Sequence, residues 1–384
     1  MLQAVGIVSE YNPFHNGHLY MLKQAKQATG ADVTVAIMSG NWLQRGEPAA
    51  YDKWQRTKAA LQGGVDLVIE LPEFSAVQPS HLFSKGAVDL AAKVKCQWLA
   101  FGAEHPQMDY QVLTDHQPEN PADFKKFDRP YASVFQDFLF NETGIRLNQP
   151  NDILGFGYAK ANAEAGNPLA LVPIQRMGSQ HDATRISHAS RIASATAIRQ
   201  AVIEHDLAAA DRVVPTGTTT MLKNDQMLTW QDFWPFLRFE LVENPIEKLH
   251  QIYQMTEGIE YRLKRAAIKA ESFTEFLHLV KTKRYTYTRI QRLCTYVLLH
   301  AASHDMLQTA TYVRLLGFNT MGQRYLNQIK GHLDVPLITK VTDDVVADTI
   351  QMDFRGGMLT QMINGLSQDY YRHPIIVRNP IIVE

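Results

Sequence analysis

Short apolar runs alternate with helical patterns through the first 200 residues of the chain. The runs predict strands at about 3–9, 32–38, 66–71, 97–102 and 169–176. Helices are predicted between them, at about 17–29, 52–63, 80–94 and 152–165. Strands this apolar are typical of a parallel sheet that has helices on both faces. The alternation therefore predicts an α/β fold with a Rossmann-like parallel sheet.

Two stretches depart from this pattern. Residues 105–150 are polar and fit no βα unit, so we expect an insertion at the carboxyl edge of the sheet, where such folds carry ligand-handling loops. After about residue 200 helical periodicity dominates, and an irregular tail is expected from about Val341. These features predict an α/β domain over 1–205 with an insertion at about 105–150, followed by a mostly helical domain over 206–384.

Composition narrows the class of protein further. No apolar run approaches the roughly 20 residues that span a bilayer, and the first residues lead directly into a strand without a signal-peptide pattern. The two cysteines, Cys96 and Cys294, lie in apolar patterns and are expected to be reduced core thiols of a cytoplasmic protein. Because the net charge is −1, any polyanionic partner must be held by a local basic patch.

The sharpest motif is His15-Asn16-Gly17-His18, directly after the first predicted strand and at the start of the first predicted helix. Histidines three apart share one face of a helix, and Gly17 lets a phosphate approach the backbone. A helix N-terminus supplies free N–H donors for a polyphosphate. The pattern favours attack on the α-phosphate of a nucleoside triphosphate, with the imidazoles stabilising the charge that develops. A zinc pair or two packing histidines are the alternatives, but no third ligand cluster is apparent nearby.

The segment from Gly6 to His18 resembles the opening of the bacterial tRNA(Met) cytidine acetate ligases, which belong to the HxGH nucleotidyltransferase superfamily. Six further segments resemble that family in the same order along the chain: 38–48, 101–104, 151–155, 192–199, 281–286 and 315–319. This ordered series is far more specific than the HxGH motif alone.

The resemblance implies an ATP-dependent ligase that works in two steps, with Mg²⁺ accompanying the ATP. Acetate would attack the α-phosphate of ATP, giving acetyl-adenylate and pyrophosphate. The N4 amine of the wobble cytidine in the anticodon arm of elongator tRNA(Met) would then take the acetyl group, giving N4-acetylcytidine and AMP. Neither a membrane nor DNA is an expected partner.

The resemblance also implies roles for individual residues. His15 and His18 are the expected catalytic residues. The expected ATP-binding residues are Ile7, Val8, Ser9, Glu10, Tyr11, Asn12, Pro13, Phe14, His15, Asn16, Gly17, His18, Leu19, Tyr20, Gly102, Asn151, Asp152, Arg176, Ser194, Thr196 and Arg199.

Several of these residues have an ordinary structural alternative. Gly102 ends the fourth strand, where a side chain would collide with a ribose or adenine, but it also suits a plain turn. Relatives often carry a second Asn where this chain has Asp152, which leaves the contact open between Asn151 and Asp152. Ser194 or Thr196 can cap a helix whose N–H groups face the β- and γ-phosphates, and Arg199 follows one turn later. A Lys-Met-Ser-Lys-Ser loop, which synthetases of this class carry there, is absent.

Other charged residues near the predicted site are less clearly assigned. Arg45, Lys53 and Arg56 are further cationic candidates, and Asp52 is either an N-cap or a catalytic group. Glu10 and Glu104 follow strands and could hold Mg²⁺, or pair with nearby arginines.

A basic and aromatic patch in the second half suits phosphate neutralisation and base stacking, although charge runs are often only solvated faces. With the resemblance, we expect the following residues to bind tRNA: Lys281, Lys283, Arg284, Tyr285, Tyr287, Arg289 and Arg292. The main rival hypothesis is a small-molecule adenylyltransferase, which has no need of such a patch. A non-catalytic RNA-binding scaffold is the second rival, and the intact His15 and His18 argue against it.

Overall fold

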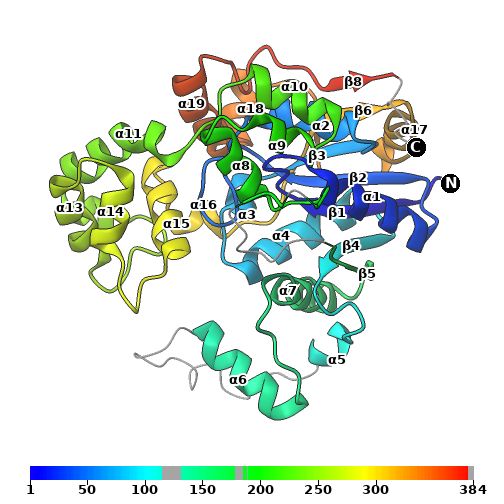
Figure 1. The fold of residues 1–384 in the computed structure, drawn as a ribbon, viewed down its shortest axis with the longest axis horizontal. Helices are drawn as coiled ribbons and strands as arrows, with labels where there is room; N and C mark the ends of the chain where they lie inside the picture. The colour runs from blue at the N-terminus through cyan, green and yellow to red at the C-terminus, as the bar shows by residue number, and fades with distance from the viewer. Residues whose placement is uncertain (115–130, 178–184, 188, 379–384) are drawn as a thin grey trace.

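The computed structural model describes residues 1–114, 131–177, 185–187 and 189–378, and for residues 131–135 it describes the backbone alone. Within these residues eight strands form one sheet in the order β5-β4-β1-β2-β3-β6-β7, with β8 paired to β6 (Figure 1). The strands are β1 Ala4–Ser9, β2 Val33–Ser39, β3 Leu67–Leu71, β4 Trp98–Ala103, β5 Ala170–Gln175, β6 Val313–Asn319, β7 Leu337–Ile338 and β8 Ile375–Val377.

Helices occupy most of the remaining described chain (Figure 1). Their bounds are α1 Asn16–Thr29, α2 Lys53–Gln62, α3 Glu73–Ala76, α4 Ser80–Lys93, α5 Tyr110–Thr114, α6 Tyr131–Thr143, α7 Pro150–Glu164, α8 Ala195–Ile203, α9 Leu207–Asp211, α10 Thr216–Asn224, α11 Trp230–Glu243, α12 Ile246–His250, α13 Ile259–Lys269, α14 Phe273–Val280, α15 Tyr287–Leu298, α16 Ser303–Met306, α17 Thr320–Ile329, α18 Asp343–Asp348 and α19 Gln351–Asn364, with a 3-10 helix η2 at Lys330–His332.

Both faces of the sheet are covered, as the apolar strands predict. Successive side chains of a strand point to opposite faces. Val33, Val35 and Ile37 of β2 therefore pack in a core with side chains of α4, α7 and α17. Ala36 and Met38, on the other face, pack in a second core with side chains of α1 and α2. Cys96 and Cys294 are buried and free.

The five predicted strands and the four predicted helices of the first half are confirmed, with bounds shifted by one or two residues. The parallel sheet is confirmed for β1 to β5. The described parts of the expected insertion hold the helices α5 and α6, and residues 115–130 lie outside the described residues.

The second half departs from the prediction in its last third. The expected helices are present from α8 to α16, but β6 then pairs antiparallel with β3, so the sheet is mixed. The tail expected to be irregular from Val341 contains α18, α19 and β8. Six of the seven residues of β6 are buried, so the strand carries no alternation of apolar and polar residues that would mark it in the sequence. The boundary at 205/206 stays a prediction.

Candidate active site

The HxGH motif lies where β1 leads into α1. Tyr11 has a positive φ of 46°, and the peptide bond between Asn12 and Pro13 is cis. His15 then forms the N-cap of α1 in an extended conformation. Its ring stacks on that of His18, with 3.8 Å between the ring centroids and 28° between the ring planes. The chain turn therefore brings the two histidines together as one pair at the carboxyl edge of the sheet.

Backbone groups fix how the two imidazoles are oriented. Nδ1 of His15 accepts a hydrogen bond from the Gly17 N–H at 3.0 Å, and Nδ1 of His18 accepts one from the His15 N–H at 3.2 Å. In a neutral imidazole whose Nδ1 is an acceptor, the proton is on Nε2. Each ring therefore has an Nε2–H donor that its capping bond does not use.

The same environment keeps both rings neutral. Burial, with Arg176 as a smaller cause, lowers the pKa of His15 to about 3. Burial lowers the pKa of His18 well below its usual value, with further contributions from His15 and Arg176. The pair can donate hydrogen bonds to phosphate oxygens near neutral pH, while positive charge comes from the arginines around it.

Gly17 is required by the stacked rings. A Cβ on this residue would lie 2.8 Å from Cε1 of His15. Any larger residue would push the His15 ring away from His18, so Gly17 preserves the pair itself in addition to leaving the helix N-terminus open.

The segment that leads into α8, together with α8 itself, contacts the HxGH motif and the residues before it. Asn16 donates through Nδ2 to the Arg191 carbonyl at 2.9 Å, and Arg199 donates to the Asn12 carbonyl at 2.8 Å. Ser194 caps α8 by accepting from the Ala197 N–H. Arg199 also lies 3.4 Å from the Thr196 hydroxyl. The structure thus brings the N-terminal ends of α1 and α8 together.

A second group of predicted residues meets at the ends of β4 and β5. Glu104 accepts from Asn151 Nδ2 at 2.5 Å, and Arg176 donates to Asn151 Oδ1 at 3.3 Å. Gly102 lies beneath Arg176, since a Cβ there would be 3.2 Å from its Cγ. Gly102, Asn151 and Arg176 therefore form one surface at the edge of the sheet, beside the histidine pair whose pKa values Arg176 lowers.

Asp152 has a different environment from its neighbour. Its side chain is buried and accepts from the backbone N–H groups of Glu104 and His105, at 3.0 and 3.1 Å, and from the Tyr110 hydroxyl at 2.8 Å. Its other oxygen lies 2.6 Å from Nδ1 of His105. Between the two candidates, this arrangement favours Asn151 as the nucleotide contact, with Asp152 holding the end of β4.

Of the run from Ile7 to Tyr20, several side chains belong to the protein core. Ile7, Tyr11 and Phe14 are buried and pack in the core shared with α1 and α2. Asn12 is also buried and accepts from the Ala50 N–H at 2.8 Å. Their positions suit a supporting role, which leaves the backbone and the polar side chains of this segment to meet a ligand. The other members are Val8, Ser9, Pro13, Leu19 and Tyr20, of which Ser9 and Pro13 are buried and the rest half-buried.

The two carboxylates considered for Mg²⁺ are already engaged. Glu10 accepts from the Gln44 N–H at 2.9 Å, and burial raises its pKa. Both oxygens of Glu104 accept hydrogen bonds, and Arg176 Nε lies 3.9 Å away. Within the described residues no group of three or more His, Cys, Asp or Glu is placed to hold a metal. Glu104 therefore fits the alternative in which it pairs with an arginine. The contact between the Gln44 N–H and Glu10 was not predicted from the sequence.

Two cationic candidates prove to be structural. Lys53 is buried between Glu70 and Asp369, at 2.9 Å from each carboxylate. Arg56 is fully buried and donates to the carbonyls of Tyr51, Glu10, Ser39 and Gly40. Neither is free to face a phosphate, because Lys53 pairs with carboxylates of β3 and of the C-terminal segment, while Arg56 holds the loops after β1 and β2.

Asp52 and Arg45, the other two charged residues considered in this segment, have different roles. Asp52 is the N-cap of α2, as its structural alternative proposed. Arg45 is exposed on a turn whose next residue, Gly46, has a φ of +77°.

The expected tRNA patch lies where α14 leads into α15. Lys283, Arg284 and Tyr287 are exposed, while Lys281, Arg289 and Arg292 are half-buried. Tyr285 is different: it is 7% exposed, packs in the helical core, and has the Arg289 guanidinium 5.1 Å from its ring centroid. A base cannot stack on a ring covered in this way, so the structure assigns Tyr285 to the core and leaves Tyr287 as the exposed aromatic.

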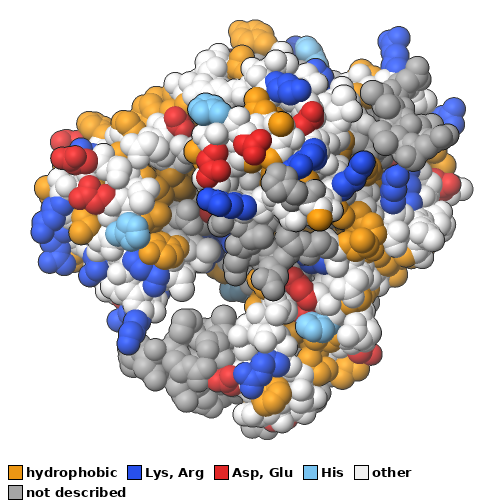
Figure 2. Space-filling model, in the orientation of Figure 1, with side chains coloured by type: hydrophobic (Ala, Val, Ile, Leu, Met, Phe, Trp, Pro, Cys, Tyr) orange, Lys and Arg blue, Asp and Glu red, His pale blue; other side chains and the backbone are white. Residues whose placement is uncertain are grey.

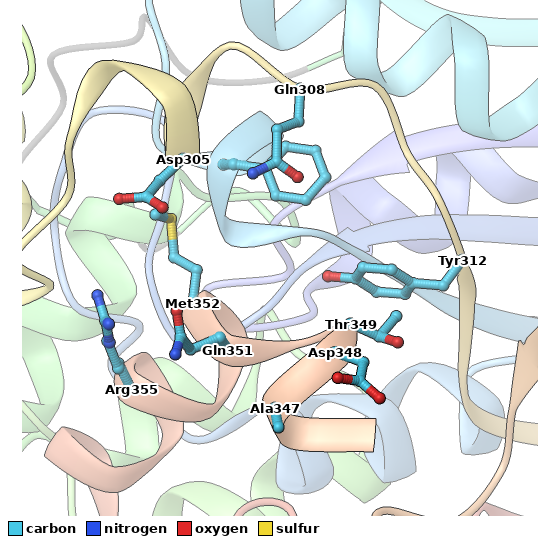
Figure 3. A pocket seen from close by; sticks show the side chains of 10 residues that line it. Asp305, Gln308, Tyr312, Ala347, Asp348, Thr349, Gln351, Met352 and Arg355 are labelled. Carbon is cyan, nitrogen blue, oxygen red and sulfur yellow. The ribbon is translucent and has the colours of Figure 1, made fainter. Parts of the chain in front are cut away.

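A cavity of about 150 Å³ lies near the end of β3 and the start of β6. Figure 3 shows Tyr312, Asp348 and Arg355 among the side chains around it, from the β6, α18 and α19 region. None of its lining residues belongs to the HxGH motif or to the β4–β5 edge.

No helix in the described part of the chain combines the length and the apolar character needed to cross a membrane.

Comparison with known proteins gives a consistent picture. Residues 2–373 match the family model described as HIGH Nucleotidyl Transferase. The chain is 54% identical to the tRNA(Met) cytidine acetate ligase of Levilactobacillus brevis, over 97% of this chain and 98% of that protein. It is 46% identical to the protein of the same name from Lactiplantibacillus plantarum, over 97% and 98% of the two chains.

Solved structures are similar over the same extent. Crystal structures of Thermotoga maritima TmcAL, in the apo form and bound with alpha-thio ATP, superpose with TM-scores of 0.90 and 0.88. Each is 28% identical and covers 98% of this chain and 100% of that chain.

Proposed function

The chain belongs to the tRNA(Met) cytidine acetate ligase family of HIGH nucleotidyltransferases, and from this premise we propose that it activates acetate with ATP and acetylates a tRNA. Acetate attacks the α-phosphorus of ATP, the bond to the β-phosphate oxygen breaks, and acetyl-adenylate and pyrophosphate form. The N4 amine of the wobble cytidine of elongator tRNA(Met) then attacks the acetyl carbonyl carbon, and AMP leaves. Because its proposed substrate is tRNA, the enzyme would work in the cytoplasm.

The observation that carries this proposal is the pair of neutral imidazoles at the start of α1. Two Nε2–H donors on one face of a helix N-terminus suit the oxygens of an α-phosphate, whose charge grows in the transition state. Since neither ring carries a charge, the pair does not tighten ground-state binding by strong ion pairing. His15 and His18 are accordingly assigned to the activation step.

The remaining contacts of ATP follow from the elements around the pair. The N-terminal end of α8, capped by Ser194, with Thr196 and Arg199 close by, is assigned to the β- and γ-phosphates. The surface made by Gly102, Asn151 and Arg176 is assigned to the nucleoside, with Asn151 and Arg176 supplying polar contacts. When Mg²⁺ is bound it neutralises triphosphate charge. Because Glu10 and Glu104 already accept hydrogen bonds from protein groups, we assign no protein ligand to the Mg²⁺ ion.

The basic patch on the α14–α15 junction supports a tRNA acceptor. Lys283, Arg284 and Tyr287 are exposed together, which suits contact with phosphates and with a base or ribose. A small-molecule adenylyltransferase would have no use for such a surface. A non-catalytic scaffold would have no use for two histidines held as donors at a helix N-terminus.

Acetate-dependent exchange between ATP and labelled pyrophosphate tests the first step. The purified full chain with ATP and Mg²⁺ should exchange pyrophosphate when acetate is added, and should not when acetate is omitted. Absence of any acetate response, with tRNA both present and omitted, would refute the proposed activation.

Mass spectrometry of tRNA nucleosides tests the second step. Elongator tRNA(Met) incubated with the enzyme, ATP and acetate should gain N4-acetylcytidine, and the same tRNA with cytidine 34 replaced by uridine should not. An enzyme that exchanges pyrophosphate but leaves the tRNA unmodified would be a small-molecule adenylyltransferase.

A further inference from the structure

Three basic residues from separate helices meet where α15 packs against the start of α4. Tyr296 of α15 donates through its hydroxyl to the Val77 carbonyl at 2.8 Å, three residues before α4 begins. Arg292 lies one helical turn before Tyr296, on the same face of α15. This face therefore directs Arg292 toward the N-terminal end of α4, where His81 is exposed.

The third basic residue comes from α7. Gly157 of α7 packs so closely on α4 that a Cβ there would lie 3.7 Å from the Ser80 carbonyl oxygen and would collide with Ser84. Lys160 follows Gly157 by three residues on the same face. It therefore lies beside the first turn of α4. Besides burial, Lys160 and Arg292 each lower the pKa of His81, while Glu164 raises it.

Arg292 is not satisfied by protein groups alone. Its Nε is buried and has no hydrogen-bond partner among the described residues, although the side chain contacts Tyr296. Burial and the nearby Arg289 lower its pKa. A guanidinium held in this way, beside Arg289 and across from Lys160, has unmet capacity for an anion.

The cluster of His81, Lys160 and Arg292 lies between the two functional regions already described. Arg289, a member of the basic patch, is one turn before Arg292 on α15. On the other side, a Cβ on Gly46 would collide with the backbone of Gln291 and Arg292, so the 43–47 turn lies directly against α15. The same turn reaches the nucleotide site, because the Gln44 N–H donates to Glu10. Figure 2 shows Lys and Arg side chains on the edge of the lobe of α13 to α15.

We propose that His81, Lys160 and Arg292 bind the phosphate backbone of the substrate RNA on its way from the basic patch to the nucleotide site. This inference rests on the proposed function, since it requires an RNA acceptor. Arg289 and Arg292 follow one another along α15, and Lys160 of α7 and the His81 imidazole of α4 continue the series, so that cations and a hydrogen-bond donor match the repeated phosphates of a strand. A single isolated anion would need only one of these positions. Lys160 and Arg292 neutralise phosphate charge, and His81 donates a hydrogen bond in its neutral form.

The double variant His81→Ala, Lys160→Ala tests this site by the salt dependence of tRNA binding. The matched control is Lys330→Ala, His332→Ala, which removes the same two residue types from η2. His332 lines a cavity together with Lys95, which follows the C-terminal end of α4. Since α4 has 14 residues and His81 lies at its start, the control site is about 20 Å from His81. Dissociation constants for tRNA are measured from 50 to 200 mM salt, and pyrophosphate exchange is measured in parallel.

The cluster variant should bind tRNA more weakly, with a log–log salt slope smaller by about 0.7 to 0.9 because one lysine–phosphate interaction is removed. The ratio of the variant's dissociation constant for tRNA to that of wild type should therefore fall about threefold between 50 and 200 mM salt. Pyrophosphate exchange and the control variant should match wild type. An unchanged affinity and slope in the folded cluster variant, or an equal loss in the control, would overturn the site. Wild-type protein that binds no tRNA would instead overturn the proposed acceptor, and this site with it.

Discussion

Backbone N–H groups, rather than other side chains, determine the chemistry of His15 and His18. Because each Nδ1 accepts from the chain turn that the motif itself makes, each ring has its proton on Nε2. Burial then keeps the rings uncharged, with the pKa of His15 at about 3. A histidine that stays neutral near pH 7 acts as a hydrogen-bond donor and cannot act as a cation. In the proposed reaction, the motif therefore contributes mainly to the transition state.

This reasoning predicts the effect of removing either ring. His15→Ala and His18→Ala should each lower the rate of acetate-dependent pyrophosphate exchange by about 100-fold or more, as for lost oxyanion donors. The dissociation constant for ATP should change much less, because the donors matter most as charge moves to the phosphate oxygens. Exchange kinetics and equilibrium ATP binding measure the two effects separately.

His304→Ala is the control for this experiment, since His304 is exposed on α16 and its side chain pairs with its neighbour Asp305. A His15 or His18 variant with near-normal exchange would mean that the pair is structural.

The sequence predicted which residues gather at one edge of the sheet better than it predicted their partners. The HxGH pair, Gly102, Asn151, Arg176 and Arg199 do meet at one edge of the sheet, because the carboxyl ends of parallel strands share that edge. Lys53 and Arg56 were predicted as cationic candidates for the site. The sequence around a cation is the same whether its side chain faces a ligand or is buried, as that of Lys53 is against Asp369. A single sequence contains no information on such distant pairing.

At the scale of elements, buried polar groups connect the sheet to the C-terminal segment. Lys53 at the start of α2 pairs with Glu70 of β3 and with Asp369, and Arg314 of β6 lies 3.3 Å from the same Asp369. Asp353 of α19 accepts from the Glu73 N–H at 2.7 Å and from the Tyr312 hydroxyl. These contacts hold α19 and the segment after it, which replace part of the expected irregular tail. Local periodicity cannot predict them, since the bonds between Glu73 and Asp353 and between Lys53 and Asp369 join residues 280 and 316 positions apart in sequence.

Asp353 gives this region a testable pH dependence. Burial, with Glu70 as a second cause, raises the pKa of Asp353 to about 7. Between the unfolded pKa near 4 and the folded pKa near 7, the native state holds a proton that the unfolded state has lost, so stability falls as pH rises through this window. Asp353→Asn removes the titration while keeping an acceptor for the Glu73 N–H.

The stability of the Asn variant relative to wild type should therefore increase between pH 5 and pH 8. The increase should be at least about 1 kcal/mol, since one pKa unit corresponds to about 1.4 kcal/mol. Denaturant unfolding of both proteins at the two pH values measures it. A difference in stability that is constant with pH would mean that Asp353 is ionised in the native state at both pH values.

At the scale of the whole molecule, two surfaces with different chemistry are separated along α15. Its N-terminal end carries the basic patch, and its middle lies against the 43–47 turn beside the nucleotide site. The helices from α11 to α15 pack in their own core together with Trp42, Phe74 and Val77 of the first half (Figure 1). Substitutions at the exposed end of α15 are therefore expected to leave the nucleotide site intact.

Neutralising Lys283, Arg284 and Arg289 together tests this separation. Removing each phosphate interaction should lower the log–log salt slope of tRNA binding by about 0.7 to 0.9. Acetate-dependent pyrophosphate exchange should persist, because the histidine pair and its arginines lie elsewhere. Arg284 and Arg289 pair with Glu257 at 2.7 and 3.6 Å on the surface, and exposed ion pairs contribute little to stability, so the variant should fold.

The control for the triple variant neutralises Lys58, Arg324 and Lys330, three exposed cations from α2, α17 and the start of η2. It removes the same net charge without touching the patch, so a purely global charge effect would weaken tRNA binding equally in both proteins. Loss of exchange together with a lower melting temperature in the patch variant would mean that these residues stabilise the lobe. If the folded patch variant keeps the affinity and salt slope of wild type, the RNA is held by another surface, and the two activities of the molecule are not divided along α15.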